Sequence, residues 1–230
     1  PGAARVSDDE QIRRVVPVIG AIARRHEVVL SVDTTRAPVA AAAIDAGARI
    51  INDVAAGTED ESMFALAARE RTGLVIMHRR CPPAADVFSH EYARAPDYGG
   101  DVVGAVARFL DERVCAAIAS GVAPDAIVVD PGLGFGKSVE QNLELIARFD
   151  GGERPVVGAS SRKSFIGAVT GVERPSDRVA GSVAASLLLW TRGVRVFRVH
   201  DVRAHRDALA VAAAVIAASR PVADGDSGSV

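Results

Sequence analysis

Seven polar side chains follow short apolar runs within a few residues, at spacings that place them at or just past the ends of successive strands. In chain order they are Asp33, Asn52, His78, Asp130, Lys163, Arg198 and His200. Because the carboxyl ends of parallel strands meet at one edge of a sheet or one mouth of a barrel, we expect them to converge. Taken singly, each also has an ordinary explanation: Asn52 as a helix cap, His78 as a core histidine, and Arg162-Lys163 as a solvated pair.

These side chains divide into hydrogen-bond acceptors and donors. Asp33, Asn52 and Asp130 offer oxygen acceptors, which suit the N–H groups on the aminopyrimidine edge of a flat heterocycle. Lys163 can donate to a ring carbonyl or nitrogen, while the Arg198 guanidinium can stack on a planar ring and also bind phosphate. The set therefore predicts a pocket for a planar, nitrogen-rich ring that carries an anionic group.

The anionic group is expected beside the last two strands, where barrels often bind phosphate. Five polar residues follow those strands: Ser161, Arg162, Lys163, Arg198 and His200. No nucleophile–base pair stands out in the sequence, and neither Cys81 nor Cys115 has a neighbour that would activate its thiol. Catalysis by orientation and by stabilisation of a leaving group is therefore favoured over a covalent intermediate.

A glycine-rich loop follows the strand predicted over 126–129. Asp130 ends that strand, and the loop then reads Pro131-Gly132-Leu133-Gly134-Phe135-Gly136-Lys137. Ser138 is the expected cap of the helix that comes next. A carboxylate at the end of a strand, followed by a loop that exposes its backbone, is typical of ligand sites in α/β proteins.

Strand and helix patterns alternate six times along the chain. Apolar runs predict strands over 28–32, 49–51, 74–77, 126–129, 155–159 and 194–197. Periodic stretches predict helices over 7–25, 38–46, 60–71, 100–120, 139–149, 177–192 and 204–218, with an irregular segment over 79–98. Strict alternation implies a parallel sheet with right-handed crossovers.

The strand ends favour a closed barrel over an open sheet. An open nucleotide-binding sheet needs a glycine fingerprint after its first strand, but the chain has Ser31-Val32-Asp33-Thr34-Thr35 there. Polar residues after every strand fit a (β/α)8 TIM barrel, of which six units and one leading helix are present. We therefore expect an α/β fold with one barrel domain over 1–220, incomplete at its N-terminus, and a flexible tail over 221–230.

Composition limits the classes of partner. The chain has 230 residues, 49% of them hydrophobic, and a formal net charge of -2, which gives no electrostatic case for nucleic acid or a membrane. No run of apolar residues is long enough to cross a bilayer, and no signal peptide is visible. Two cysteines without metal-type spacing indicate a reducing, cytoplasmic setting. The chain begins at Pro1-Gly2 without a methionine, as if cut from something longer.

Six motifs in a fixed order resemble dihydropteroate synthase, and they cover nearly the whole chain apart from its C-terminal tail. They are Ser31-Val32-Asp33-Thr34, Ile51-Asn52-Asp53-Val54, Met77-His78, Asp130-Pro131-Gly132-Leu133-Gly134-Phe135-Gly136-Lys137, Ser161-Arg162-Lys163-Ser164-Phe165-Ile166-Gly167 and Arg198-Val199-His200-Asp201-Val202. The resemblance implies strands 3–8 of that family's barrel, a homodimer, and Mg²⁺ as cofactor. It also implies the joining of p-aminobenzoate to a 6-hydroxymethyl-dihydropterin diphosphate, with release of pyrophosphate.

The same resemblance implies three groups of site residues. The pterin ring would be held by Asp33, Asn52, Asp130 and Lys163, with Met77 lining its pocket. The diphosphate would be held by Arg198, which also stacks on the pterin, and by His200. The p-aminobenzoate pocket, where sulfonamides compete, would be shaped by Pro1, Phe135, Ser161 and Arg162. Catalysis would rest on Lys163, Arg198 and Asp130.

The chain also departs from the family pattern. The Asn-Val-Thr-Pro-Asp-Ser-Phe loop after the first strand is absent, so we expect no Mg²⁺ ligand in this chain. The segment Arg79-Arg80-Cys81-Pro82-Pro83 replaces the usual Met-Arg-Gly-x-Pro. An open remnant of the barrel would expose sheet edges and apolar surface. If residues 1–230 are the whole protein, we expect them to lack synthase activity.

Two other functions stay open. One is an inactive pterin-binding fragment or paralogue, which only an assay separates from the synthase. The other is a pterin-binding methyltransferase domain that serves a corrinoid protein. Arg198 and His200 argue against methyl transfer, because that reaction leaves no diphosphate to bind.

Overall fold

The computed structural model describes residues 2–218. Its α-helices are α1 (Asp8–Ala23), α2 (Ala37–Asp45), α3 (Ser62–Glu70), α4 (Val102–Ala119), α5 (Val139–Arg148), α6 (Ser164–Thr170), α7 (Val179–Thr191) and α8 (Val202–Ala218). Its strands are β1 (Ser31–Asp33), β2 (Ile50–Asp53), β3 (Gly73–Met77), β4 (Ile127–Asp130), β5 (Val157–Gly158) and β6 (Val196–Phe197). Short 3-10 turns occur at η1 (Pro83–Ala85), η2 (Pro124–Ala126) and η3 (Pro175–Asp177). Pro1 and the predicted tail over 221–230 lie outside the described residues.

The six strands are parallel and follow one another in chain order, as predicted. One sheet has the order β1-β2-β3-β4, and a second contains β5 and β6. A bridge between Val129 and Val156 joins the two sheets, and the Val129 amide donates to the Pro155 carbonyl at 3.0 Å. This is the order of strands in an α/β barrel, but within residues 2–218 β1 and β6 do not pair, so the barrel stays open.

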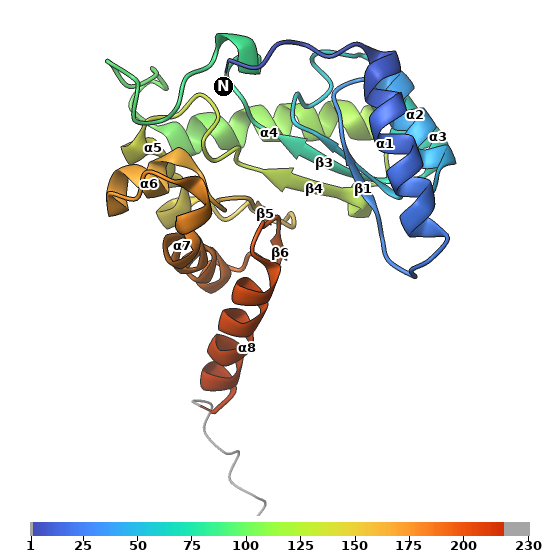
Figure 1. Cartoon of the computed structure of the whole chain (residues 1–230). Coiled ribbons are helices and arrows are strands. Elements are labelled where there is room, and N and C mark those ends of the chain that lie inside the picture. The colour runs from blue at the N-terminus through green and yellow to red at the C-terminus, as the bar shows by residue number, and fades with distance from the viewer. Residues whose placement is uncertain (1, 219–230) are drawn as a thin grey trace, which may run out of the picture.

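The helices lie around this arc of strands. Figure 1 shows α4 running along one side of the sheet, α1 to α3 grouped beyond β1, and α5 to α7 gathered on the side of β5 and β6. The last helix, α8, projects away from β6. In a parallel sheet every crossover brings the chain back to the same end, so all strand ends share one mouth.

Alternating strand residues face the helices and the barrel interior. Leu74 and Ile76 of β3 are fully buried in the main core, against α4 residues such as Val106 and Val114. The residue between them, Val75, packs with Val157 and other small apolar residues on the interior side. The two packed faces fix β3 in place and thereby hold its polar end at the mouth.

Helix caps form where the sequence places them. The Ser7 hydroxyl accepts from the Glu10 amide at the start of α1, while the Glu10 carboxylate pairs with Arg13 and Arg14. At the start of α5, Ser138 and Gln141 form a reciprocal capping box. That cap anchors the end of the glycine-rich loop to a rigid helix.

The first strand is shorter than predicted, and it begins later. The sequence indicated a strand over 28–32, but Val28 and Val29 are 56% and 70% exposed, and β1 begins at Ser31. The reason is pairing: Ser31 faces Ile50, the first residue of β2, so the residues before it extend past the neighbouring strand. β5 and β6 are also shorter than the runs 155–159 and 194–197.

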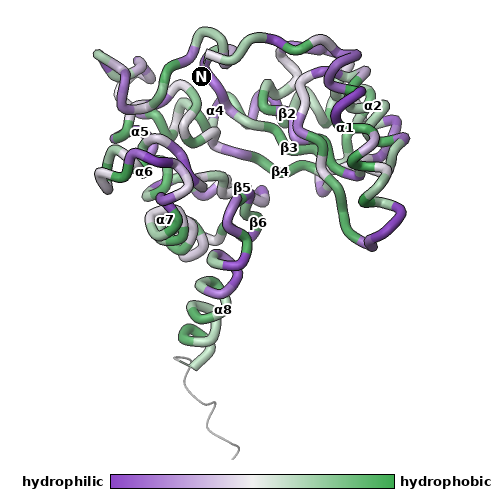
Figure 2. The backbone as a smooth tube through the Cα atoms, in the orientation of Figure 1, coloured by the Kyte–Doolittle hydropathy of each residue, from purple (hydrophilic) through white to green (hydrophobic). Residues whose placement is uncertain are grey.

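The open edges leave apolar side chains in solvent, as expected for an unclosed barrel. Val196 of β6 is exposed, and so are Val211, Val215 and Ile216 of α8. Figure 2 shows this apolar character in the later turns of the projecting α8, whereas its first turns are largely hydrophilic. Among the described residues no helix combines the length and the apolar character needed to cross a membrane.

Candidate functional site

Asp33 and Asn52 stand side by side at the mouth because β1 and β2 pair in register there. The Asn52 amide donates to Asp33 Oδ2 at 3.1 Å, and the Arg198 guanidinium donates to the same oxygen at 2.6 Å. Asn52 is buried, whereas the side chains of Asp33 and Arg198 are 43% and 57% exposed. An exposed ion pair adds little to stability, so a ligand can replace it at small cost.

Asp130 and Met77 form a buried pair at the neighbouring strand ends. The register of β3 and β4 places the two residues opposite each other, and both are almost fully buried. Asp130 Oδ1 accepts from the Gly132 amide at 2.7 Å. Burial raises the pKa of the Asp130 carboxyl, and the Gly132 amide and nearby Lys163 oppose that change. Asp130 is thus a carboxylate that a cation or an N–H donor would stabilise.

The glycine-rich loop takes one conformation because its backbone is bonded on several sides. The Gly134 amide donates to Asn142 Oδ1 at 2.6 Å, and the Gly136 amide donates to Asp86 Oδ2 at 2.9 Å. Gly132 has a φ of 68°, and a β-carbon there would lie 1.8 Å from the His78 carbonyl oxygen. The loop therefore requires glycine at this close approach.

Asp33, Asn52 and Asp130, at the ends of β1, β2 and β4, form an acidic wall of the mouth. Lys163 lies between the glycine-rich loop and this acidic wall. Its Nζ is 4.0 Å from the centre of the Phe135 ring, in a cation–π contact. Burial lowers the pKa of Lys163 to about 8, although Asp130 and Asp33 favour its charged form. The amine is thus close to both the carboxylates and the aromatic ring that the sequence assigned to one site.

Ser161, His200 and Arg198 gather at the ends of β5 and β6. Ser161 Oγ lies 3.1 Å from His200 Nδ1 and accepts from the His200 amide at 3.2 Å. The Arg198 amide donates to the Gly158 carbonyl at 3.1 Å, which continues the pairing of the two strands. Burial, together with the positive charges of Arg162 and Arg198, lowers the pKa of His200. The cluster offers donors and positive charge to an anion.

Arg162 is held in an unusual backbone conformation. Its φ is 61°, and its amide donates to Ser182 Oγ at 2.9 Å. Its guanidinium makes a two-point ion pair with Asp201, at 3.0 and 2.7 Å. The Arg178 guanidinium also donates to the Arg162 carbonyl at 3.1 Å. Arg162 thus keeps a left-handed backbone conformation because its amide, its carbonyl and its side chain are all hydrogen-bonded. Residues in such strained conformations cluster at binding sites.

Most of the residues predicted for the site come together, and one predicted neighbour turns away from it. His78 is buried against the rings of Phe109 and Tyr98, and its Nδ1 lies 2.9 Å from Lys137 Nζ. Burial lowers its pKa to about 3, so it behaves as a neutral core residue. Pro1, predicted for the second pocket, lies outside the described residues.

The sequence interpretation missed several residues that hold the site together. They are Asp86, Lys137, Asn142 and Arg178, each of which bonds the backbone of a mouth loop. Lys137 ends the glycine-rich motif, and Asn142 lies in the first turns of the capped helix. Their positions in the sequence, next to the loop, could therefore have indicated that they contact it. Asp86 lies in the irregular segment 79–98, and Arg178 lies at the start of the predicted helix 177–192. Nothing in the sequence marked either of them as a site residue.

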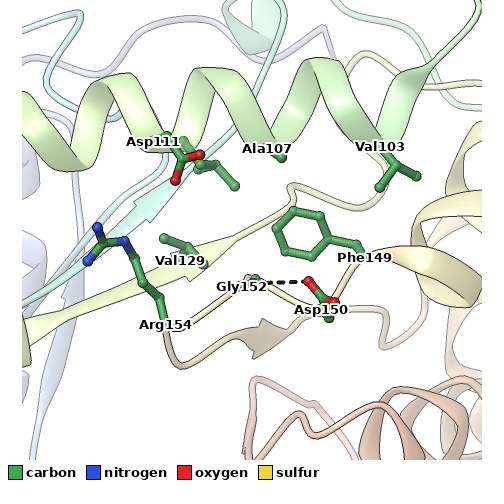
Figure 3. A pocket seen from close by; sticks show the side chains of 10 residues that line it. Val103, Ala107, Asp111, Val129, Phe149, Asp150, Gly152 and Arg154 are labelled. Carbon is green, nitrogen blue, oxygen red and sulfur yellow. Dashed lines mark hydrogen bonds between the residues drawn. The ribbon is translucent and has the colours of Figure 1, made fainter.

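One surface pocket of the structure is separate from the predicted site. Figure 3 shows a surface pocket between α4 and the segment that joins α5 to β5, lined by Asp111, Phe149 and Arg154 among others. None of the predicted site residues lines it.

Within residues 2–218 no three His, Cys, Asp or Glu side chains are grouped so that they could hold a metal ion. No step below depends on Mg²⁺.

The chain matches a family model and curated proteins over most of its length. The model for pterin binding enzymes matches residues 1–200. The dihydropteroate synthase of Escherichia coli is 38% identical over 95% of this chain and 75% of that protein. That of Synechocystis is 36% identical over 89% of this chain and 69% of that protein. The chain therefore spans about three quarters of the length of these relatives.

Solved structures give the same match. The Xanthomonas albilineans dihydropteroate synthase with 4-aminobenzoic acid has a TM-score of 0.85 and 43% identity, over 94% of this chain and 76% of that one. The same enzyme in complex with 7,8-dihydropteroate has a TM-score of 0.83 and 42% identity, over 94% and 78%. Yersinia pestis DHPS with a pterine-sulfa conjugate has a TM-score of 0.83 and 33% identity, over 94% and 79%.

Proposed function

We propose that this chain, which belongs to the dihydropteroate synthase family of pterin-binding enzymes, binds two substrates in adjacent pockets at the mouth of its barrel. One is 6-hydroxymethyl-7,8-dihydropterin diphosphate, and the other is p-aminobenzoate. The products are 7,8-dihydropteroate and pyrophosphate. The observation that carries the proposal is the convergence of Asp33, Asn52, Asp130, Lys163 and Arg198 on one mouth, where the two cations lie beside the carboxylates.

The pterin would lie against the acidic wall. Asp33, Asn52 and Asp130 present oxygen atoms at adjacent strand ends, where the amino and N–H groups of a pterin can donate. Lys163, close to Asp130, would donate to the ring, and the buried Met77 beside Asp130 would pack on it. The exposed Arg198 would leave Asp33 and stack on the ring, which is a contact that guanidinium groups favour.

The diphosphate would lie beside Arg198 and His200. Ser161 fixes the His200 ring at 3.1 Å, and the surrounding arginines make the cluster positive. The p-aminobenzoate would lie next to it, between Phe135 and the Ser161-Arg162 turn. The family resemblance would add Pro1 to this second pocket, but Pro1 lies outside the described residues.

The proposed reaction breaks one bond and forms another at the exocyclic methylene of the pterin. The C–O bond to diphosphate breaks first, and the oxygen keeps the electron pair, so the pterin becomes a cation and pyrophosphate leaves. The aniline nitrogen then attacks the methylene and loses a proton. Asp130 would stabilise the pterin cation, and Arg198 with His200 would stabilise the departing anion. Orientation by the two pockets supplies the remainder of the catalysis.

Mg²⁺ belongs to this proposal as a cofactor that would offset the charge of the diphosphate. No three His, Cys, Asp or Glu side chains are grouped for a metal ion within residues 2–218. We therefore expect it to be held by the substrate and by groups other than those described here. If calorimetry shows equal affinity for the pterin diphosphate with and without Mg²⁺, this cofactor assignment is wrong.

Oligomeric state and location are also part of the proposal. Leu143, Val169 and Leu188 are exposed around an apolar groove formed by α5, α6 and α7, which suits the outer-helix homodimer that the family resemblance implies. Sedimentation as a monomer at micromolar concentration would contradict the dimer. Cys81 and Cys115 are both free, which fits the cytoplasm; recovery of the protein from an oxidising compartment would contradict that location.

The synthase activity is tested with the protein at its natural length. It should convert the pterin diphosphate and p-aminobenzoate to 7,8-dihydropteroate with one pyrophosphate released per product. Omission of either substrate should abolish product formation, and a sulfonamide should compete with p-aminobenzoate. A protein that binds the pterin diphosphate but forms no product would favour a pterin-binding role without catalysis.

Arg162→Ala should weaken the binding of p-aminobenzoate more than that of the pterin diphosphate. The Arg162 turn lies on the side of the proposed second pocket, and its ion pair with Asp201 keeps the guanidinium away from the acidic wall. We expect KM for p-aminobenzoate to rise by about fivefold or more, with the pterin diphosphate affinity within about twofold. Steady-state kinetics and calorimetry measure the two effects. Equal changes in both would refute the division of the mouth.

A further inference from the structure

Lys137 is one of only two lysines in a chain that has 27 Lys and Arg residues together. The other is Lys163, so both amines lie at the proposed site, and arginine supplies the basic side chains everywhere else. An ammonium group directs three N–H bonds from one atom, whereas a guanidinium is a flat fork. At Lys137, whose single nitrogen bonds the Gly132 and Phe135 carbonyls, this geometry suits lysine better than arginine.

The Lys137 ammonium is completely buried and fully hydrogen-bonded. It donates to the Phe135 carbonyl at 2.9 Å and to the Gly132 carbonyl at 3.0 Å, and it lies 2.9 Å from His78 Nδ1. Its side chain is 0% exposed. Burial lowers the pKa of this amine to about 7, although nearby Asp130 favours its charged form. In that charged form three partners use all three N–H donors, which leaves none for a substrate. A buried amine is costly unless each donor has a partner, and this arrangement meets that requirement.

Among the hydrogen-bond partners of Lys137, His78 is held rigidly. The His78 ring packs edge-on against Phe109 of α4 at 4.9 Å and against Tyr98 at 5.8 Å. The His78 amide donates to the Asp130 carbonyl at 3.0 Å, which extends the pairing of β3 and β4. Lys137 thus connects the glycine-rich loop to the sheet and to the main helix of the core.

Lys137 also bonds the part of the loop that carries Phe135. The Phe135 amide donates to the Gly132 carbonyl at 3.1 Å, and its own carbonyl accepts from Lys137. Its half-buried ring lies over Lys163. Asp130 is held more firmly, because its backbone pairs with Met77 in the sheet. Lys137 influences it only indirectly, through its bond to Gly132, whose amide donates to Asp130 Oδ1, and through its charge. Loss of the Lys137 ammonium should therefore loosen Phe135 more than Asp130.

We propose that Lys137 is a positioning residue for the second substrate: its ammonium fixes the Phe135 backbone, so that the ring packs against the aromatic amine. The inference rests on the proposed function, because it needs Phe135 to line the p-aminobenzoate pocket. Lys137 touches neither substrate and acts chiefly through Phe135.

The test is the effect of Lys137→Met on each substrate. Methionine fills the same volume and removes the three donors. We expect KM for p-aminobenzoate to rise by about fivefold or more, with kcat and the affinity for the pterin diphosphate within about twofold. A general structural defect would instead lower stability and change both substrates together. Equal effects on both substrates, or none on p-aminobenzoate in a folded variant, would overturn the inference.

Two further variants isolate the path through Phe135. In a Phe135→Ala background, Lys137→Met should add less than about twofold to KM for p-aminobenzoate, because the residue it acts through is gone; additive effects would contradict the proposal. Tyr98→Phe is the matched control, since it removes a bond of 2.8 Å to the Gly136 carbonyl in the same loop. It should not separate the two substrates.

The outcome stays decisive if Lys137→Met does not fold. Lys137→Gln keeps one amide donor in a similar volume, and the same separation between substrates is expected at smaller size. If the wild-type protein makes no dihydropteroate, the proposed function fails. If it makes product and neither Lys137 variant separates the two substrates, only the role of Lys137 fails.

Discussion

Gly132→Ala should destabilise the protein by at least about 2 kcal/mol, because two penalties coincide at this position. Its φ of 68° is strained for any residue with a β-carbon. The new methyl group would also lie 1.8 Å from the His78 carbonyl oxygen, which belongs to the rigid end of β3. The backbone must then move, and the Asp130 and Lys137 bonds to Gly132 move with it. Denaturant unfolding at neutral pH measures the loss.

Gly171→Ala is the matched control for that experiment. Gly171 ends α6 with a φ of 72°, but nothing lies within 4 Å of a β-carbon built there. It should cost only the conformational penalty, roughly 1 kcal/mol. The difference between the two variants therefore isolates the close approach to His78. Equal losses would mean that the loop relaxes freely, contrary to its dense hydrogen bonding.

Lys163→Ala should weaken the binding of the pterin diphosphate by about 1–3 kcal/mol, the range for a buried polar contact, which is roughly 5- to 150-fold in affinity. The amine lies close to Asp130 and over the Phe135 ring, so its removal takes away the cation that most favours the charged form of Asp130. Calorimetry with the pterin diphosphate measures the change. Lys163→Met, which keeps the aliphatic part, separates the loss of the ammonium from the loss of packing.

The same group gives the binding a pH dependence of known sign. Burial lowers the pKa of Lys163 to about 8, so the ammonium is lost as pH rises through that value. Since the charged form favours an anionic ligand, affinity for the pterin diphosphate should fall as the pH rises above about 8. Lys163→Met should remove that fall. An unchanged profile in the variant would mean that another group titrates.

Side-chain chemistry at strand ends was predictable because polar residues interrupt apolar runs there. Asp33, Asn52, Asp130 and Lys163 follow such runs, and parallel strands bring them to one mouth whatever the details of packing. The capped start of α5 at Ser138 was predictable for a similar reason, since its signal is local.

Contacts between distant segments were not predictable from the sequence. The bond between Arg198 and Asp33 spans 165 residues and depends on the curvature of the whole arc of strands. His78 follows a strand just as Asp130 does, yet it turns inward because Phe109 and Lys137 offer it a buried place. The exposed Val28 and Val29 carry a strand pattern, but β2 does not extend far enough to pair with them.

The central claim is that the strand ends of this mouth hold the pterin diphosphate, and calorimetric titration of the wild type and Asp130→Asn tests it most directly. Asparagine keeps the shape of Asp130 and its acceptor for the Gly132 amide, and removes only the charge. The wild type should bind one pterin diphosphate per chain, and the variant should bind it at least about tenfold more weakly, as expected for a lost charged contact. Equal affinity in the two proteins, or no binding by the wild type, would contradict the claim.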